Sequence, residues 1–330
     1  MRYAIVSAAL AASAAAHGVV TKIQGANGVI MPGLSIADGT PRDCSSNRCG
    51  SQADTAIIRD RDMKSGKASP LGRTQGNGPV DASAVISAFM GSGGAGKTPS
   101  NNGASGSVGQ EDDLSGLEKQ KQQRRDDYKR QLGQLFGGLL GGGGAGAGGA
   151  GGKKNAGGLG ALGGLLGGAA GGGGGGNKNN APAESMIADT SGQGAKQGLP
   201  TADENGEVSM VFRQINQDGA GPLTASIDPS SGGTDASAFQ NAKVTQNVPG
   251  LGIGGLSLKT NTDFPLKVKM PAGMTCNGKA GGAENVCIVR VANGAAAGPF
   301  GGSAAFTQTQ AARKRAIAYR LKKRMEFNRE

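Results

Sequence analysis

His17 is the residue best placed for chemistry, because it is the only histidine in the 330-residue chain. Arg2 precedes an apolar run at 3–12, and the small residues AAA follow at 14–16. This is the pattern of a secretory signal peptide with its cleavage site. We therefore predict a signal peptide at 1–16, cleavage directly before His17 and a secreted protein. The alternative is the apolar first helix of a cytosolic protein.

A chain that begins at His17 presents an α-amine and an imidazole nitrogen from one residue. Both nitrogens suit Cu(II) in tetragonal geometry, so His17 is the candidate metal-binding residue and copper the candidate cofactor. An oxidative histidine brace needs a second imidazole, which the chain lacks, and the guanidinium of Arg213 cannot ligate a metal. Asp43, Asp54 or Asp218 would complete a weaker site. The alternative is that His17 merely follows a common cleavage motif.

The four cysteines are Cys44, Cys49, Cys276 and Cys287. An even number of cysteines in a secreted chain predicts disulfides. Three connectivities exist, and the local pairs Cys44–Cys49 and Cys276–Cys287 are favoured because each lies within one loop or hairpin. Neither spacing is that of the usual zinc sites.

Short apolar runs in the second half of the chain predict β-strands. Residues 207–215 and 264–270 alternate apolar and polar side chains, with Arg213 and Lys267 on the polar face. Further strands are expected at 18–24, 286–291 and 303–308. Several short strands between Gly-rich turns favour an all-β, immunoglobulin-like β-sandwich. Pro265 indicates a sheet edge or the start of a strand.

The first part of the chain is rich in turns. A long, ordered surface loop is expected between residues 25 and 62, where Asn-Gly, Pro-Gly and Asp-Gly pairs recur. A short helix is expected at 81–90, with Asp81 as its N-cap and one apolar face.

Glycine accounts for 63 residues and is concentrated at 137–176. Gly-rich sequence has few side chains to bury and a high ordering entropy. We therefore predict a disordered insertion at 91–183 within a single β-sandwich domain formed by 17–90 and 184–310. The dibasic pair at 124–125 would be open to a processing protease.

The tail, residues 311–330, is predicted to be a basic helix. Residues 313–324 carry seven positive charges and no acid, and so account for most of the net charge of +11. A basic tail suits an anionic wall polymer, a membrane surface or nucleic acid; the alternative is a solvated or removed tail. A transmembrane segment is not expected, because no apolar stretch reaches about 18 residues.

Loops and carboxylates offer two further patterns. The strings NQDGAGPL (216–223) and AGPFGG (297–302) are expected at one end of the sandwich, as tight turns or as a surface for a partner. Carboxylates in IIRDRD (57–62) and DEN (203–205) would offer a hydrolytic pair. Charged turn residues more often cap backbone amides.

Five strings carry a family resemblance: HGVVTKIQGANGVIMPGLSIADGTPRDC, GSQADTAIIRDRD, LGRTQGNGPVDA, VFRQINQDGAGPL and AGPFGG. They cover most of 17–90 and 207–302. They resemble the Mas-type, appressorium-associated (Egh-like) virulence-factor family of filamentous fungi. The resemblance implies secretion, expression during surface penetration and no settled biochemical activity. It also implies partners on the host surface or in the fungal cell wall.

The function predicted from the sequence is a secreted or cell-surface, non-enzymatic factor in fungal host penetration. The alternative is a copper-binding, carbohydrate-associated protein related to lytic polysaccharide monooxygenases, which are also β-sandwiches beginning at a histidine. A Gly-rich wall component is a third hypothesis, which depends on the insertion alone. The Gly tract lacks the arginines and aromatics that bind nucleic acid, so nucleic acid is not an expected partner. The oligomeric state is left open.

Overall fold

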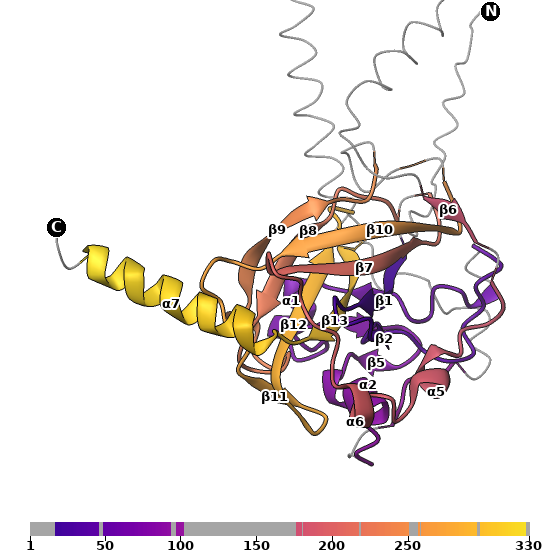
Figure 1. Ribbon diagram of the computed structural model, residues 1–330. Coiled ribbons are helices and arrows are strands. Elements are labelled where there is room, and N and C mark those ends of the chain that lie inside the picture. Colours follow the sequence, from indigo (N-terminus) through magenta and orange to yellow (C-terminus); the bar gives the residue numbers. More distant parts are fainter. Residues whose placement is uncertain are drawn as a thin grey trace, which may run out of the picture. The chain divides into compact units, whose positions relative to one another are not determined.

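A continuous sheet of antiparallel strands carries the fold in the computed structural model (Figure 1). The structure describes residues 17–45, 49–93, 97–101, 176–179, 181–217, 219–250, 257, 259–295 and 298–327. The first layer contains β2 (Ile30–Pro32), β1 (Gly18–Gln24), β7 (Glu207–Gln214), β10 (Thr262–Lys269) and β6 (Asn177–Lys178). The second contains β8 (Thr224–Asp228), β12 (Ala283–Ala292), β13 (Phe300–Phe306), β3 (Ala56–Ile57), β4 (Arg73–Thr74), β5 (Gly78–Pro79) and β11 (Gly278–Ala280).

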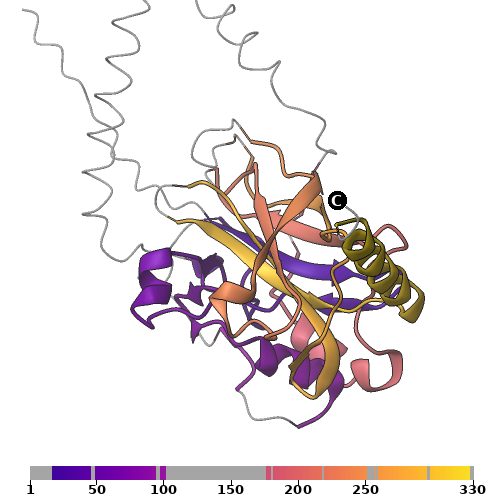
Figure 2. The same cartoon turned by 90° about the vertical axis from the view of Figure 1, so that its left-hand side faces the viewer.

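Strand β9 (Gln240–Gln246) joins the two layers, because it pairs with β10 on one side and with β8 on the other. The sheet therefore curls, as Figure 2 shows from the side. The curl brings β1 against β13, where a Cβ on Gly302 would lie 2.7 Å from the backbone nitrogen of Val20. This approach closes the core between the layers.

Apolar side chains from both layers fill that core. Burial alternates along β10, as expected for a strand with one face inward. The fully buried large side chains include Ile23, Phe212, Phe264, Phe300 and Phe306. The prediction of an all-β fold is confirmed.

The expectations for two individual strand residues are wrong or hold only in part. Arg213 is 2% exposed although the alternation placed it on the polar face. Pro265 lies inside β10, which begins at Thr262, and so it does not mark a strand start; the expected edge is present only as a local gap in the pairing. On the edge of β10 away from β7, β6 pairs with 262–263 and β9 with 267–269. Pro265 lies between those two ladders, where its missing N–H leaves no ladder hydrogen bond unmade.

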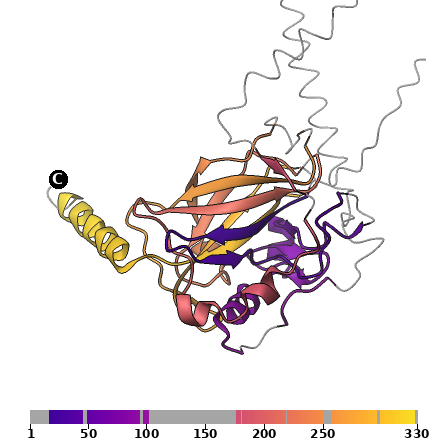
Figure 3. The ribbon, with the colours of Figure 1, turned by 45° about the vertical axis from the view of Figure 1, so that its right-hand side comes forward.

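Helix α2 (Ala82–Met90) forms where the sequence predicts it. Asp81 caps it by accepting a hydrogen bond from the backbone N–H of Ser83 at 2.8 Å. The apolar face of α2 is buried, with Phe89 against Gly194 of α6 (Gly194–Gln197). A Cβ on Gly194 would lie 2.6 Å from the ring of Phe89, so only glycine permits this contact. Helix α5 (Met186–Thr190) packs beside them, below β1 and β2 (Figure 3).

The remaining helices among the described residues are α1 (Asp60–Lys64), the 3₁₀ turn η2 (Ala236–Ala238) and α7 (Gln310–Phe327). The helical tail is therefore confirmed. In the described part of the chain, α7 included, no helix has the length and apolar character needed to cross a bilayer.

The turn-rich stretch after β2 is ordered, but the prediction that it lies on the surface is wrong. Ile36, Thr40 and Arg42 are among its residues that are almost fully buried. It runs over the end of the sandwich, where it covers polar groups.

The two predicted disulfides, Cys44–Cys49 and Cys276–Cys287, both form. Cys276–Cys287 fastens the loop before β11 to β12, and both of its cysteines are buried. Of the predicted insertion at 91–183, most lies outside the described residues. Two described segments near its ends contact the sandwich, one at 97–101 and one beginning at residue 176. Asn101 donates its N–H to the carbonyl of Asp38 at 2.7 Å, and β6 pairs with β10.

Candidate functional site

One end of the sandwich brings together segments from three of the five strings that carry the family resemblance. Strand β1 begins there, β7 ends there, and Gly18 pairs with Gln214. Loop 216–223 follows β7, and the loop before β13 meets the end of β12, where Ala292 pairs with Gly301. Antiparallel pairing therefore brings together segments that are far apart in the sequence.

His17 lies at the centre of this end, and its side chain is 1% exposed. Its backbone nitrogen donates a hydrogen bond to Oδ1 of Asn216 at 2.7 Å, and its carbonyl accepts one from Ile215 at 3.0 Å. The imidazole packs on the ring of Phe300, with centroids 4.7 Å apart. We call His17, Asn216 and Phe300 the His17 cluster.

Glycines let the two loops approach this cluster closely. A Cβ on Gly219 would lie 1.9 Å from the carbonyl oxygen of His17, and one on Gly298 would lie 2.4 Å from the nitrogen of Phe300. Asn293 ties the loops together, because its Oδ1 accepts from Phe300 at 3.0 Å and its Nδ2 donates to Ala220 at 3.3 Å. The glycines therefore serve close packing of the chain on itself.

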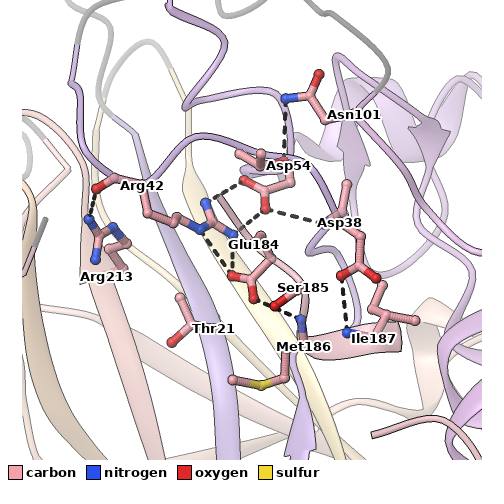
Figure 4. Close-up of polar contacts among 12 residues, drawn as sticks. Thr21, Asp38, Arg42, Asp54, Asn101, Glu184, Ser185, Met186, Ile187 and Arg213 are labelled. Atoms are coloured by element: carbon pink, nitrogen blue, oxygen red, sulfur yellow. Dashed lines mark hydrogen bonds and ion pairs between the residues drawn. The ribbon is translucent and has the colours of Figure 1, made fainter. Parts of the chain in front are cut away.

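Figure 4 shows a second group of polar residues, a buried ionic cluster around Arg42. Arg42 donates to both carboxylate oxygens of Asp54, with Nη2 2.6 Å from Oδ2 and Nη1 3.2 Å from Oδ1. It also donates to Oε2 of Glu184, from Nε at 3.0 Å and Nη2 at 2.9 Å. Arg42 is 4% exposed and Asp54 0%. Two carboxylates therefore share one guanidinium away from water.

Arg213 extends this cluster along the sheet. Its Nη1 lies 3.0 Å from Oδ1 of Asp263, and its Nη2 donates to the backbone carbonyls of Arg42 and Asn179. We call Arg42, Asp54, Glu184, Arg213 and Asp263 the Arg42 network. The network explains why Arg213 is buried in spite of the strand alternation.

Backbone contacts fix the loop positions of the network. Gly39 donates its N–H to the carbonyl of Glu184 at 2.7 Å, and Glu184 donates to the carbonyl of Thr40 at 2.8 Å. Asp38 accepts from Ile187 at 3.0 Å and so holds the start of α5. The segment that follows residue 183 is thereby fastened to the loop that carries Arg42.

Burial and pairing act in opposite directions on the charges of the network. Burial alone disfavours a charged Arg42, but Asp54 and Glu184 outweigh this and raise the pKa of Arg42. Full burial raises the pKa of Asp54, against the attraction of Arg42. Burial also lowers the pKa of Arg213, and Asp263 offsets only part of that. The arrangement pairs each buried guanidinium with at least one carboxylate.

Of the three residues proposed as further metal ligands, the structure describes Asp43 and Asp54. Asp54 is held by Arg42, and Asp43 is exposed. Asp218 lies outside the described residues. Among the residues that the structure describes, no group of three or more histidine, cysteine or acidic side chains is arranged to hold a metal ion. Copper at His17 stays a prediction.

The other carboxylates hold structural positions. Asp62 is buried and its Oδ2 lies 3.2 Å from Nε of Arg73. Asp203 caps a turn by accepting from the N–H groups of Asn205 and Glu207 at 2.8 and 2.7 Å. These contacts match the interpretation of such residues as caps and ion pairs rather than as a hydrolytic pair.

The pattern of the sequence did not reveal Arg42 and Glu184 as site residues. They are 142 positions apart, and the Gly-rich stretch separates them. Arg42 stands among turn residues that favoured an exposed position. Only the three-dimensional fold brings the two side chains together.

Fold and site together define an all-β protein with two disulfides. Loops cover one end of its sandwich, and buried arginines there are paired with carboxylates. Residues 15–301 match the family described as Egh16-like virulence factor, and the chain belongs to that family. The predicted resemblance is thus confirmed.

Two curated relatives come from Pyricularia oryzae (strain 70-15). The appressoria-specific virulence factor GAS2 is 48% identical over 322 residues, which cover 97% of this chain and 93% of the relative. The appressoria-specific virulence factor GAS1 is 36% identical over 144 residues, which cover 42% and 54%. No solved structure matches the chain.

Proposed function

We propose that this protein is a secreted or cell-surface, non-enzymatic factor that acts in fungal host penetration. The family match and the names of the two relatives support the role in virulence. The two disulfides support an oxidising, extracellular destination, because such bonds are rare in the cytosol. Host-surface or cell-wall components are the partners that fit this destination.

The state of the Arg42 network favours binding over catalysis. A general acid or base must be free to exchange a proton with a bound substrate. Asp54 and Glu184 instead share Arg42, and Asp54 is fully buried. The network therefore stabilises the end of the sandwich, and the loops that it supports offer a surface to a partner.

Gene disruption in the source organism tests the role. We expect fewer successful host penetrations per appressorium, and recovery when the intact gene is returned. A gene copy with Asp54→Ala, whose product should lose the folded end of the sandwich, is expected not to restore penetration. Penetration at the wild-type level without the gene would contradict the proposal.

Analysis of the culture medium tests secretion separately. We expect the protein in the medium or at the cell surface, with an N-terminal sequence that begins at His17. A protein retained inside the cell with Met1 intact would contradict secretion.

We propose copper binding at His17 as a second candidate function. The nitrogen that cleavage before His17 would turn into the α-amine is already positioned by Asn216 at 2.7 Å. The amine and imidazole would hold the ion, which would supply redox chemistry or a structural cross-link. Titration of processed protein with Cu(II) should show binding tighter than micromolar, abolished when Met precedes His17. Micromolar or weaker binding that is unchanged by the extra Met would exclude the site.

A further inference from the structure

Helix α7 is the most exposed element of the described chain that carries large apolar side chains. Ile317, Leu321 and Met325 recur every four residues and so lie along one side of the helix. Leu321 is 54% exposed and Met325 60%. Phe327 is 79% exposed but follows Met325 by only two residues, so it lies on another side of the helix. Apolar side chains exposed in series mark a surface that a partner covers.

The first half of α7 is fastened to the sandwich. Arg313 donates to the carbonyl of Cys276 at 3.1 Å and to Oδ1 of Asn277 at 2.8 Å. Arg320 donates to Thr275 at 3.2 Å. In the described residues the hydrogen bonds from α7 to the sandwich end there. The second half of α7 extends beyond them, away from the strands, as Figure 1 shows.

The same helix is strongly basic. Residues 313–324 hold seven lysines and arginines, and Glu326 is the only acid in α7. Lys322 is paired with Glu326 at 3.9 Å. Arg324 is three residues after Leu321 and so lies next to the apolar side of the helix, while Lys323 adds positive charge to the same turn. The positive charge of α7 therefore favours binding to a negatively charged surface.

We propose that α7 is a membrane-surface anchor that binds bilayers containing anionic lipid. A soluble polyanion would neutralise the basic residues but leave Leu321 and Met325 in water. The interface of a bilayer accepts both, because headgroups meet the cations and the acyl boundary takes the apolar side chains. The helix lies on the bilayer and does not span it. The proposal is independent of secretion and of copper at His17.

Vesicle co-sedimentation of the full mature chain tests this anchor. We expect binding to phosphatidylcholine vesicles that contain phosphatidylglycerol, little binding to pure phosphatidylcholine, and weakening at high salt. Lys323→Glu with Arg324→Glu should weaken binding by about tenfold or more. Leu321→Ser with Met325→Ser should weaken it comparably. These side chains are exposed, so the urea midpoints of both variants should stay at the wild-type value.

The matched control is Lys243→Glu with Lys269→Glu, which changes the net charge equally on β9 and β10. Both lysines are exposed. Equal loss of binding in the control would overturn the role of α7. Equal binding to both vesicle types would overturn the lipid preference. Loss with the charge variant but not with the serine variant, together with binding to heparin, would assign α7 to soluble polyanions instead.

Discussion

Arg42 is buried with two carboxylates and holds both by hydrogen bonds. Removing ions from water costs several kcal/mol per ion, and pairing in good geometry recovers much of that cost. The bidentate contact with Asp54 provides such geometry. The stability of this end of the sandwich therefore depends on keeping all partners of the network in place.

Asp54→Ala should destabilise the protein by about 3–5 kcal/mol, because it leaves Arg42 buried with Glu184 as its only carboxylate partner. Urea denaturation followed by circular dichroism measures this loss. Asp43→Ala is the control: Asp43 is the exposed neighbour of Arg42, and we expect a change within about 0.5 kcal/mol. The double variant Arg42→Ala with Asp54→Ala should cost less than the sum of the single variants. Strict additivity would contradict the pairing.

Asp228 links stability to pH at the end of β8. Burial opposes its charge, but hydrogen bonds from the side chain and N–H of Ser231 and from the N–H groups of Ser230 and Gly233 lower the pKa of Asp228 below its ordinary value. A lowered pKa in the folded state contributes stability above the unfolded value of about 4. That contribution is lost as the pH falls through the folded value.

Asp228→Asn should therefore be less stable than the wild type at neutral pH, and its stability should fall less steeply below about pH 4. Urea midpoints measured from neutral pH to strongly acidic pH report both effects. Asp43→Asn, which changes an exposed carboxyl elsewhere, serves as the comparison. If the urea midpoints of wild type and Asp228→Asn fell in parallel as the pH is lowered, Asp228 would not be the source of the acid dependence of stability.

Among the elements, α2 shows how a local signal and tertiary packing combine. Asp81→Ala removes the oxygen that accepts from Ser83 and should destabilise the protein by about 1 kcal/mol. Asp81→Asn keeps a capping oxygen and should stay near the wild-type value. Thermal unfolding of the three proteins decides this. Equal loss in both variants would mean that charge rather than capping matters.

Elements with a strong local signal could be predicted from the sequence. The alternation in β10, the cap of α2 and the composition of α7 each depend on residues close in the chain. The burial of loop residues such as Ile36, Thr40 and Arg42 could not be predicted in this way, because turn residues indicate a change of direction and not depth. Their burial arises from the contacts of Arg42 with segments that follow the insertion.

The candidate site was predictable only in part for the same reason. His17 stood out as the sole histidine, and its neighbouring strings marked one end of the sandwich. The alternation of β7 predicted that Arg213 points outward. The alternation contains no information on the distant carboxylate of Asp263, which pairs with the guanidinium in the fold. Long-range ion pairs have no local signature in a single sequence.

At the scale of the whole molecule, the Cys276–Cys287 disulfide joins a loop to the central part of the second layer. Replacing both of these cysteines with alanine should destabilise the protein by about 2–4 kcal/mol. The disulfide Cys44–Cys49 closes a shorter loop, with a separation of 5 rather than 11 residues. Its replacement by two alanines should therefore lower the free energy of unfolding by less. Urea midpoints of the two double variants give the order, and the reverse order would contradict this ranking.

The two ends of the stretch between Asn101 and Gly176 are each fastened to the sandwich. The part before it supplies β1, an interior strand between β2 and β7, and β3, which pairs with β13. A single cut within that stretch would therefore yield two polypeptides that share one sheet, each completing the other. After such a cut the protein would be a non-covalent heterodimer of two parts of one gene product. The shared sheet, and not the linking peptide, would hold the two parts together.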